Sequence, residues 1–67
     1  MRDPSQYYAK FEDGIAAHDI ALSEEFRALA KTHTPRQIFL WLENLKREGR
    51  FPDELEQLLV DFYGLFC

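Results

Sequence analysis

Apolar residues recur at intervals of three and four along most of the chain, which is the spacing of an amphipathic α-helix. Near the N-terminus, Tyr8, Phe11 and Ile15 follow this spacing. Pro4 precedes them at a position that suits the first turn of a helix, where the N–H group that proline lacks would have no partner. The pattern therefore predicts a first helix over about residues 4–18.

The pattern blurs between residues 18 and 22, and two interpretations follow. Ser23 precedes two glutamates, which is typical of a helix N-cap with acids at the positive end of the helix dipole, and predicts a second helix from there to about Thr32. Alternatively the apolar positions stay in phase across the break. One helix of about 28 residues, about 42 Å long at 1.5 Å per residue, would then need a second chain to cover it.

A strong local signal for a helix start lies at Thr34. Thr34 is followed by Pro35 and, three residues after the cap, by Gln37, which is the pattern of a capping box with proline at the first helical position. Gly49 can close this helix because glycine readily adopts the left-handed conformation. Its apolar stripe consists of Ile38, Trp41, Leu42 and Leu45.

The same capping logic predicts a last helix that begins at Asp53, after Pro52. Its apolar stripe consists of Leu55, Leu58, Leu59, Phe62 and Phe66, widened by Tyr63 and Leu65. This arc of about 160° is wider than one neighbouring helix covers. The last helix is therefore expected to be either central to a bundle or one half of an interface.

These elements predict an all-α fold, a small bundle of three to four short helices, or a long first helix followed by a helical hairpin. The 67 residues allow one core, so we expect a single helical domain over residues 1–67. Such a short chain buries only about 60% of its unfolded surface. With Cys67 as the single cysteine and two isolated histidines, neither a disulfide nor a zinc site can reinforce it. Self-association remains, and we predict a homodimer.

The charges are unevenly distributed along the chain. Residues 1–26 hold two basic and six acidic residues, residues 27–50 hold six basic and two acidic, and residues 51–67 hold four acidic residues and no basic one. The total of −4 therefore conceals a basic middle between acidic ends. The simplest interpretation is that these segments neutralise one another across the bundle.

One face of the third predicted helix combines an apolar residue with arginines. On a helical wheel Leu40 lies opposite the core stripe among charged residues, with an aromatic residue at the flank of this face. Such a composition is favoured at protein interfaces. The predicted partner-binding residues are Arg36, Phe39, Leu40, Glu43 and Arg47, with Tyr63 and Phe66 from the last helix.

The sequence offers no set of residues for catalysis. His18 and Asp19 are adjacent, so on a helix they point to different faces, and no serine or cysteine is placed to act as their nucleophile. No phosphate-binding glycine loop or metal-ligand spacing occurs. We therefore expect no enzymatic activity, no cofactor and no metal. The chain also lacks a signal-peptide pattern and the roughly 20 apolar residues of a membrane span, which predicts a cytoplasmic location.

The segment from Phe26 to Phe51 resembles the helix, turn and helix of winged-helix and related transcription regulators. The resemblance lies in Leu29 and Ala30 before the turn, the Thr34 cap, and the stripe of the following helix up to Phe51. It implies a DNA-binding regulator whose Arg36 and Gln37, with Phe39 and Leu40, face the major groove.

The acidic net charge favours a protein partner over nucleic acid, since DNA-binding proteins usually present a basic surface. The primary hypothesis is a non-enzymatic regulator or adaptor that binds a protein through its third and fourth helices. Small acidic proteins of this kind are often inhibitors or modulators of larger intracellular machines. The DNA-binding regulator is the alternative.

Overall fold

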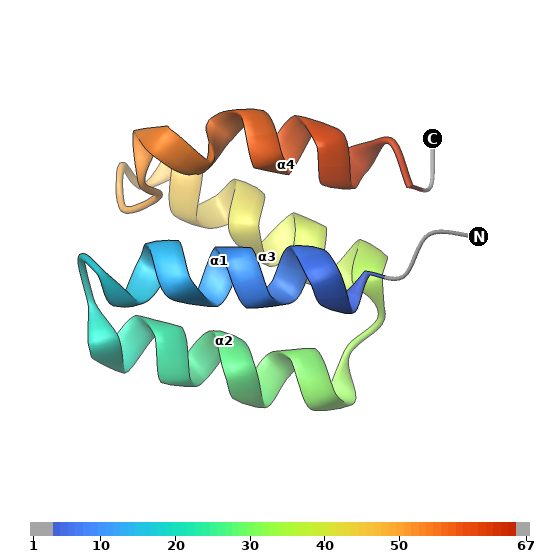
Figure 1. Cartoon of the computed structure of the whole chain (residues 1–67), viewed down its shortest axis with the longest axis horizontal. Coiled ribbons are helices and arrows are strands. Elements are labelled where there is room, and N and C mark those ends of the chain that lie inside the picture. Colours follow the sequence, from blue (N-terminus) through green and yellow to red (C-terminus); the bar gives the residue numbers. More distant parts are fainter. Residues whose placement is uncertain (1–3, 66–67) are drawn as a thin grey trace.

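The computed structural model describes residues 4–65, which form four α-helices and one 3₁₀-helix without a strand. They are α1 (Ser5–Ala16), α2 (Ile20–Thr32), α3 (Pro35–Arg47), η1 (Asp53–Leu55) and α4 (Glu56–Tyr63). Consecutive helices run in opposite directions (Figure 1). The all-α prediction is thus confirmed for the described part of the chain, as is a first helix close to the expected bounds.

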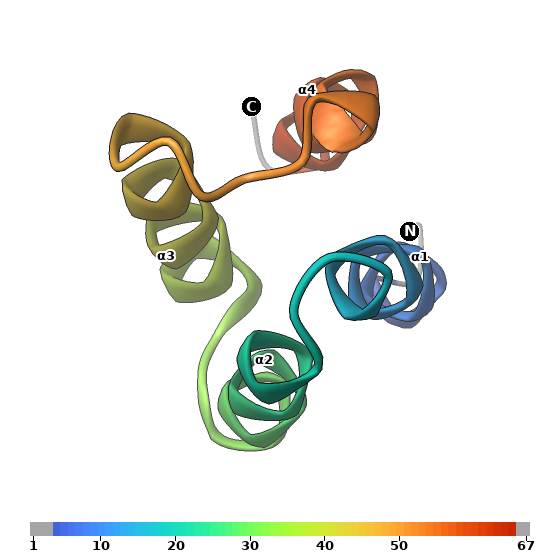
Figure 2. The same ribbon diagram turned by 90° about the vertical axis from the view of Figure 1, so that its left-hand side faces the viewer.

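The helices form a ring around one core. Contacts join α1 to α2, α2 to α3, α3 to α4, and α4 back to α1. Seen from one end, the helices occupy four corners, and α3 is inclined to the other three (Figure 2). Each helix therefore packs against the helices next to it in the ring, and α4 closes the ring against α1.

The chain breaks between α1 and α2, so the alternative of one long helix is wrong. Asp19 leaves the helical conformation, with φ −156° and ψ 100°, and its carboxylate accepts a hydrogen bond of 3.1 Å from the backbone N–H of Leu22. The prediction of a cap at Ser23 is also wrong. Ser23 is buried inside α2, where its hydroxyl donates to the carbonyl oxygen of Ile20 at 2.7 Å, so its polar group is satisfied within the helix.

Both predicted ends of α3 are confirmed. The Gln37 backbone N–H donates to the Thr34 hydroxyl at 3.2 Å, and the Thr34 N–H donates to the Gln37 side-chain oxygen at 2.9 Å, which completes the capping box. Gly49 has a φ of +76°, and the Arg50 N–H returns to the carbonyl oxygen of Leu45 at 2.9 Å. These two local signals fix where the basic α3 begins and ends.

The start of α4 differs from the sequence prediction. The Asp53 side chain caps no helix; Asp53–Leu55 forms a 3₁₀ turn in which the Leu55 N–H donates to the Pro52 carbonyl oxygen at 3.0 Å. This tighter turn carries Leu55 into the bundle against α1. A Cβ atom added to Gly14 would lie 2.6 Å from a methyl carbon of Leu55, so a larger residue at this position would require the Leu55 side chain to shift.

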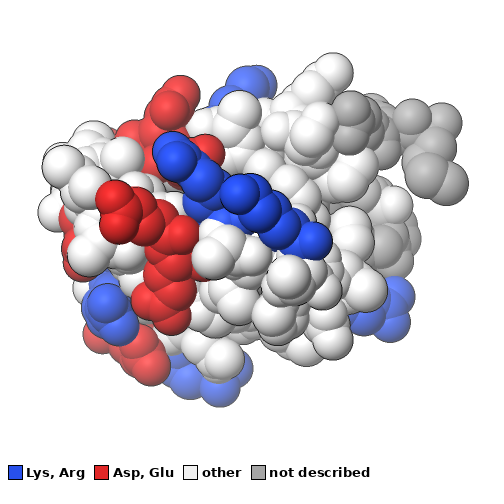
Figure 3. Space-filling view, turned by 90° about the horizontal axis from the view of Figure 1, so that it is seen from below, with Lys and Arg blue, Asp and Glu red and all other residues white. Residues whose placement is uncertain are grey.

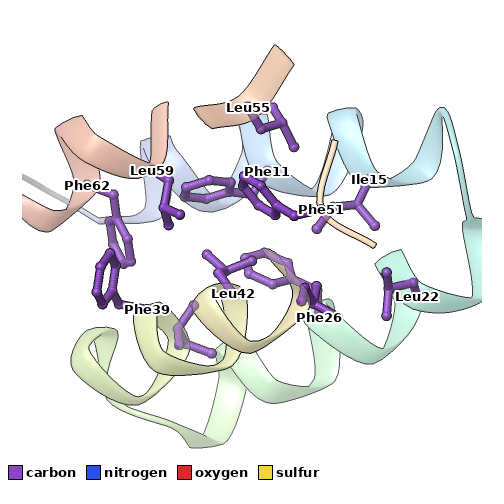
Figure 4. Close-up of a cluster of buried hydrophobic side chains, with 12 residues drawn as sticks. Phe11, Ile15, Leu22, Phe26, Phe39, Leu42, Phe51, Leu55, Leu59 and Phe62 are labelled. Carbon is purple, nitrogen blue, oxygen red and sulfur yellow. The ribbon is translucent and has the colours of Figure 1, made fainter. Parts of the chain in front are cut away.

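Five phenylalanines of residues 4–65 lie in the core, four of them from four different helices: Phe11, Phe26, Phe39 and Phe62, with Phe51 from the loop after α3 (Figure 4). Phe11 of α1 lies 6.1 Å from the ring of Phe26 in α2 and 5.6 Å from the ring of Phe62 in α4, both in edge-to-face geometry. Tyr8 makes similar contacts with Phe26 and Phe62. Each such pair adds about 0.5–1.5 kcal/mol beyond its buried area. The α3 helix adds the fully buried Ile38 and Leu42.

Ion pairs link the basic middle of the chain to its acidic ends. Arg27 of α2 pairs with Glu12 of α1, and Lys46 of α3 pairs with Glu56 of α4. In the view with α2 nearest the reader, acidic side chains gather toward the end of the bundle that holds the α1–α2 turn, beside a short basic stripe (Figure 3). These pairs agree with the interpretation that the charged segments neutralise one another. Because Arg27 and both members of the Lys46–Glu56 pair are exposed to solvent, each pair contributes only about 0–1 kcal/mol.

Candidate protein-binding surface

An open groove of about 270 Å³ runs between α3 and α4. We call it the α3–α4 groove; it is lined by Phe39, Glu43 and Lys46 from α3 and by Leu59, Val60 and Tyr63 from α4. Three of the predicted partner-binding residues, Phe39, Glu43 and Tyr63, therefore meet here, although the sequence placed them on two separate helices. The groove exists because α3 and α4 are antiparallel neighbours whose core residues face inward.

Phe39 forms the floor of this groove. Its side chain is only 9% exposed, and its ring lies 4.9 Å from the ring of Tyr63 and 6.4 Å from that of Phe62. The expectation that Phe39 flanks an exposed face is wrong, because α4 covers that side of α3. Because it is buried, Phe39 is also poorly placed to contact DNA, as the resemblance to transcription regulators implies that it would.

Two of the exposed apolar side chains, Val60 and Tyr63, line the groove. Among the residues that the structure describes, four large hydrophobic side chains are exposed: Ile20 (67%), Leu40 (56%), Val60 (62%) and Tyr63 (45%). Three of the four belong to α3 and α4, and the prediction that Leu40 is exposed is confirmed. Val60 was missed by sequence reasoning because it falls outside the apolar stripe of α4. An apolar, β-branched residue on the polar side of that helix was the available signal.

The charged residues that line the groove are Glu43 and Lys46, both on α3, whereas Leu59, Val60 and Tyr63 of α4 contribute no charge. The Lys46 amine lies 2.9 Å from a Glu56 carboxylate oxygen across one end of the groove. The hydrogen bond to Glu56, followed by the charge of Glu56, raises the pKa of Lys46 above its ordinary value. Lys46 is therefore cationic throughout the physiological range.

The outer side of α3 continues the groove. Arg36, Leu40 and Arg47 are exposed and share one side of the helix with Glu43, which is half-buried. In residues 4–65 Arg47 makes no salt bridge. The predicted Phe66 lies outside the described residues. We refer to the groove together with Arg36, Leu40 and Arg47 as the α3–α4 surface.

A second groove, of about 250 Å³, lies between α2 and the C-terminal half of α3. Its lining residues are Leu22, Glu25, Trp41, Asn44, Leu45, Glu48 and Arg50. The Arg50 guanidinium lies 3.6 Å from the Glu48 carboxylate, and Trp41 packs against Phe26 with ring centroids 5.9 Å apart. This groove is mainly polar, so it offers a partner less apolar contact than the α3–α4 groove. The α3–α4 surface is the better candidate for docking.

Within residues 4–65, no three His, Cys, Asp or Glu side chains are grouped so that they could hold a metal ion. None of the described helices is long and apolar enough to cross a membrane. Comparison of the chain with protein-family models, with curated proteins and with solved structures finds no match.

Proposed function

We propose that this protein is a non-enzymatic regulator or adaptor that binds another protein through its α3–α4 surface. The observation that carries the proposal is that Val60 and Tyr63 are exposed in the lining of one groove, and that Leu40, one helical turn from the groove-lining Glu43, is exposed as well. Contiguous apolar side chains rimmed by polar ones are typical of protein interaction sites. Tyrosine and arginine, both present here, are enriched among the residues that contribute most binding energy.

The parts of the surface have distinct roles in this proposal. The Tyr63 ring packs on the buried Phe39, so it is held in place before a partner arrives and loses little freedom on binding. Val60, beside Tyr63 in the groove lining, and Leu40 on the outer side of α3 supply further apolar contact area. Arg36 and Arg47 favour a partner with carboxylates at the edge of the contact. A chain of this size would act as an inhibitor or modulator by covering a surface of a larger intracellular assembly.

The proposal can be tested by affinity purification from the native host with wild-type protein and two variants. Leu40→Asp places a charge in the α3–α4 surface, and we expect the captured protein to bind at least about tenfold more weakly, a loss of about 1.4 kcal/mol. Ile20→Asp is the matched control, because Ile20 is at least as exposed as Leu40 but lies on α2. Circular dichroism should show that both variants fold.

Two results would count against the proposal. Equal loss of the captured protein in both variants would show that binding does not depend on the α3–α4 surface. Retention of the wild-type protein on duplex DNA, weakening steeply with salt and lost in an Arg36→Ala, Arg47→Ala variant, would instead support the DNA-binding alternative. Docking of a protein on Leu40 and Val60 predicts no such steep salt dependence.

A further inference from the structure

We infer that the groove between α2 and α3 binds an arginine side chain from a basic segment of a protein partner. This groove is separate from the α3–α4 surface, and its contact with a partner is charged where that of the α3–α4 surface is apolar. Three features of the molecule support such a site: the charge of the bundle end that holds the groove, the carboxylates in its lining, and the tryptophan beside them.

The end of the bundle that holds the α1–α2 turn and the loop after α3 is strongly acidic. Both connections lie at this end (Figure 1), and His18 of the turn lies 2.6 Å from a carboxylate oxygen of Glu54 in η1. Residues 17–25 hold three acidic residues and no lysine or arginine, and residues 48–55 hold three acidic residues and one arginine. All six acidic residues are exposed. A surface of this charge attracts a basic partner and speeds its association.

Two of these carboxylates line the α2–α3 groove of about 250 Å³, Glu25 from α2 and Glu48 from the residue after α3. Glu48 already attracts an arginine of the same chain, since the Arg50 guanidinium lies 3.6 Å away. Glu25 makes no salt bridge in residues 4–65. Because the Glu48–Arg50 pair is neutral, the charge of Glu25 is left to attract a second guanidinium.

Trp41 supplies an aromatic surface in the same groove. Its side chain is half-buried and its ring lies 5.9 Å from that of Phe26, so the indole is held in position before a partner arrives. A cation over the face of a tryptophan is attracted by the charge distribution of the ring, and a planar guanidinium also stacks on it. A groove that offers both a carboxylate and an indole ring is therefore suited to arginine.

The acidic surface extends further than one arginine covers. Asp19, Glu24, Asp53 and Glu54 belong to the same end of the bundle but not to the groove lining. A free small cation would leave these carboxylates unmatched, whereas a segment with further lysines or arginines places a cation near several of them. The same negative charge disfavours nucleic acid at this end. The occupant that fits is therefore a basic segment of a protein.

The test uses the full chain and a peptide of alternating arginine and alanine with both ends blocked. Trp41 is the single tryptophan of the sequence, so its fluorescence reports on the groove, and calorimetry measures binding independently. We expect a change in Trp41 emission that saturates with the arginine peptide and weakens with salt. A peptide with citrulline in place of arginine is the control, because citrulline is neutral and has nearly the same shape.

Two neighbouring carboxylates separate the groove from the rest of the acidic end. Glu25 lines the groove, whereas Glu24 is exposed beside it on α2 and does not. Glu25→Gln should weaken binding of the arginine peptide about fivefold, and Glu24→Gln less than about twofold. Leu40→Ala, a change in the α3–α4 surface, should leave peptide binding unchanged. Circular dichroism confirms that each variant is folded.

Four outcomes would overturn the inference. The first is that the arginine peptide produces neither a change in emission nor heat, and the second is that the citrulline peptide binds equally well. Equal losses in Glu24→Gln and Glu25→Gln would show attraction to the whole acidic end and no site in the groove. Binding of free arginine amide as tight as that of the peptide would show a site for a small cation. None of these results decides the proposed function, which Leu40→Asp tests separately.

Discussion

Replacing Tyr8 with phenylalanine is expected to stabilise the protein. The Tyr8 ring lies 5.7 Å from that of Phe26 and 5.8 Å from that of Phe62, both in edge-to-face geometry. Its hydroxyl oxygen is buried and, within residues 4–65, has no hydrogen-bond partner. Tyr8→Phe keeps both ring contacts and removes only the unsatisfied hydroxyl.

The magnitude follows from the desolvation of that hydroxyl. Leaving a buried polar group without a partner costs about 1–3 kcal/mol. We expect a gain near the lower end, about 1 kcal/mol, because removing the oxygen also leaves a small void that offsets part of the benefit. For a domain of this size, about 1 kcal/mol raises the melting temperature by about 4–8 °C.

The substitution also changes the alkaline limit of stability. Burial raises the pKa of the Tyr8 phenol above its ordinary value, so the folded chain keeps this proton at a pH where the unfolded chain releases it. The contribution of the protonated Tyr8 phenol to the free energy of unfolding is fully present below the pKa of about 10 that this group has in the unfolded chain. It is lost as the pH rises through the higher pKa of the folded chain. Tyr8→Phe should therefore unfold less readily than the wild type as the pH rises above about 10.

Urea and thermal unfolding followed by circular dichroism measure both effects. Tyr63→Phe is the control. Tyr63 is 45% exposed, so removing its hydroxyl should change the free energy of unfolding by no more than about 0.5 kcal/mol. If Tyr8→Phe lowered the free energy of unfolding by about 1 kcal/mol, the hydroxyl would have to be hydrogen-bonded and the reasoning would be refuted.

Three further predictions concern helix packing and helix ends, each measured by urea unfolding. Gly14→Ala should leave the free energy of unfolding unchanged or lower it by up to about 2 kcal/mol, because the new methyl group meets Leu55. An increase of about 1 kcal/mol, which alanine usually gives over glycine inside a helix, would contradict this. Thr34→Ala should cost about 1 kcal/mol through the lost cap, and unchanged stability would argue against the capping box. Asp19→Ala should lower the free energy of unfolding by about 1 kcal/mol, and Ser23→Ala by less than about 0.5 kcal/mol. A larger loss for Ser23→Ala than for Asp19→Ala would show that Ser23 is the cap.

Signals confined to a few neighbouring residues were read correctly from the sequence. The Thr34 capping box and the Gly49 terminus depend on backbone groups within one turn, so their chemistry is complete in the local sequence. The sequence pattern predicted Ser23 as the cap of α2, whereas the structure has Asp19 there. The choice between them depends on which residue the core buries, and that is set by α1 and α3 and not by local spacing.

The candidate surface was only partly predictable for the same reason. Periodicity showed that Leu40 points away from the core, and this is correct. It could not show that α4 lies over the Phe39 side of α3. The spacing of apolar residues within α3 does not say where a neighbouring helix will pack. The close approach of Leu55 to Gly14 also arises from the 3₁₀ turn, which the sequence had suggested would be a simple helix cap.

The connectivity of the four helices has a kinetic consequence. Every helix contacts its neighbour in the chain, and only two residues separate α2 from α3. Closing such short loops costs little chain entropy, and folds built from contacts near in sequence cross a low barrier. The protein should therefore refold within microseconds to milliseconds. Trp41, packed on Phe26, is placed to report that event by its fluorescence.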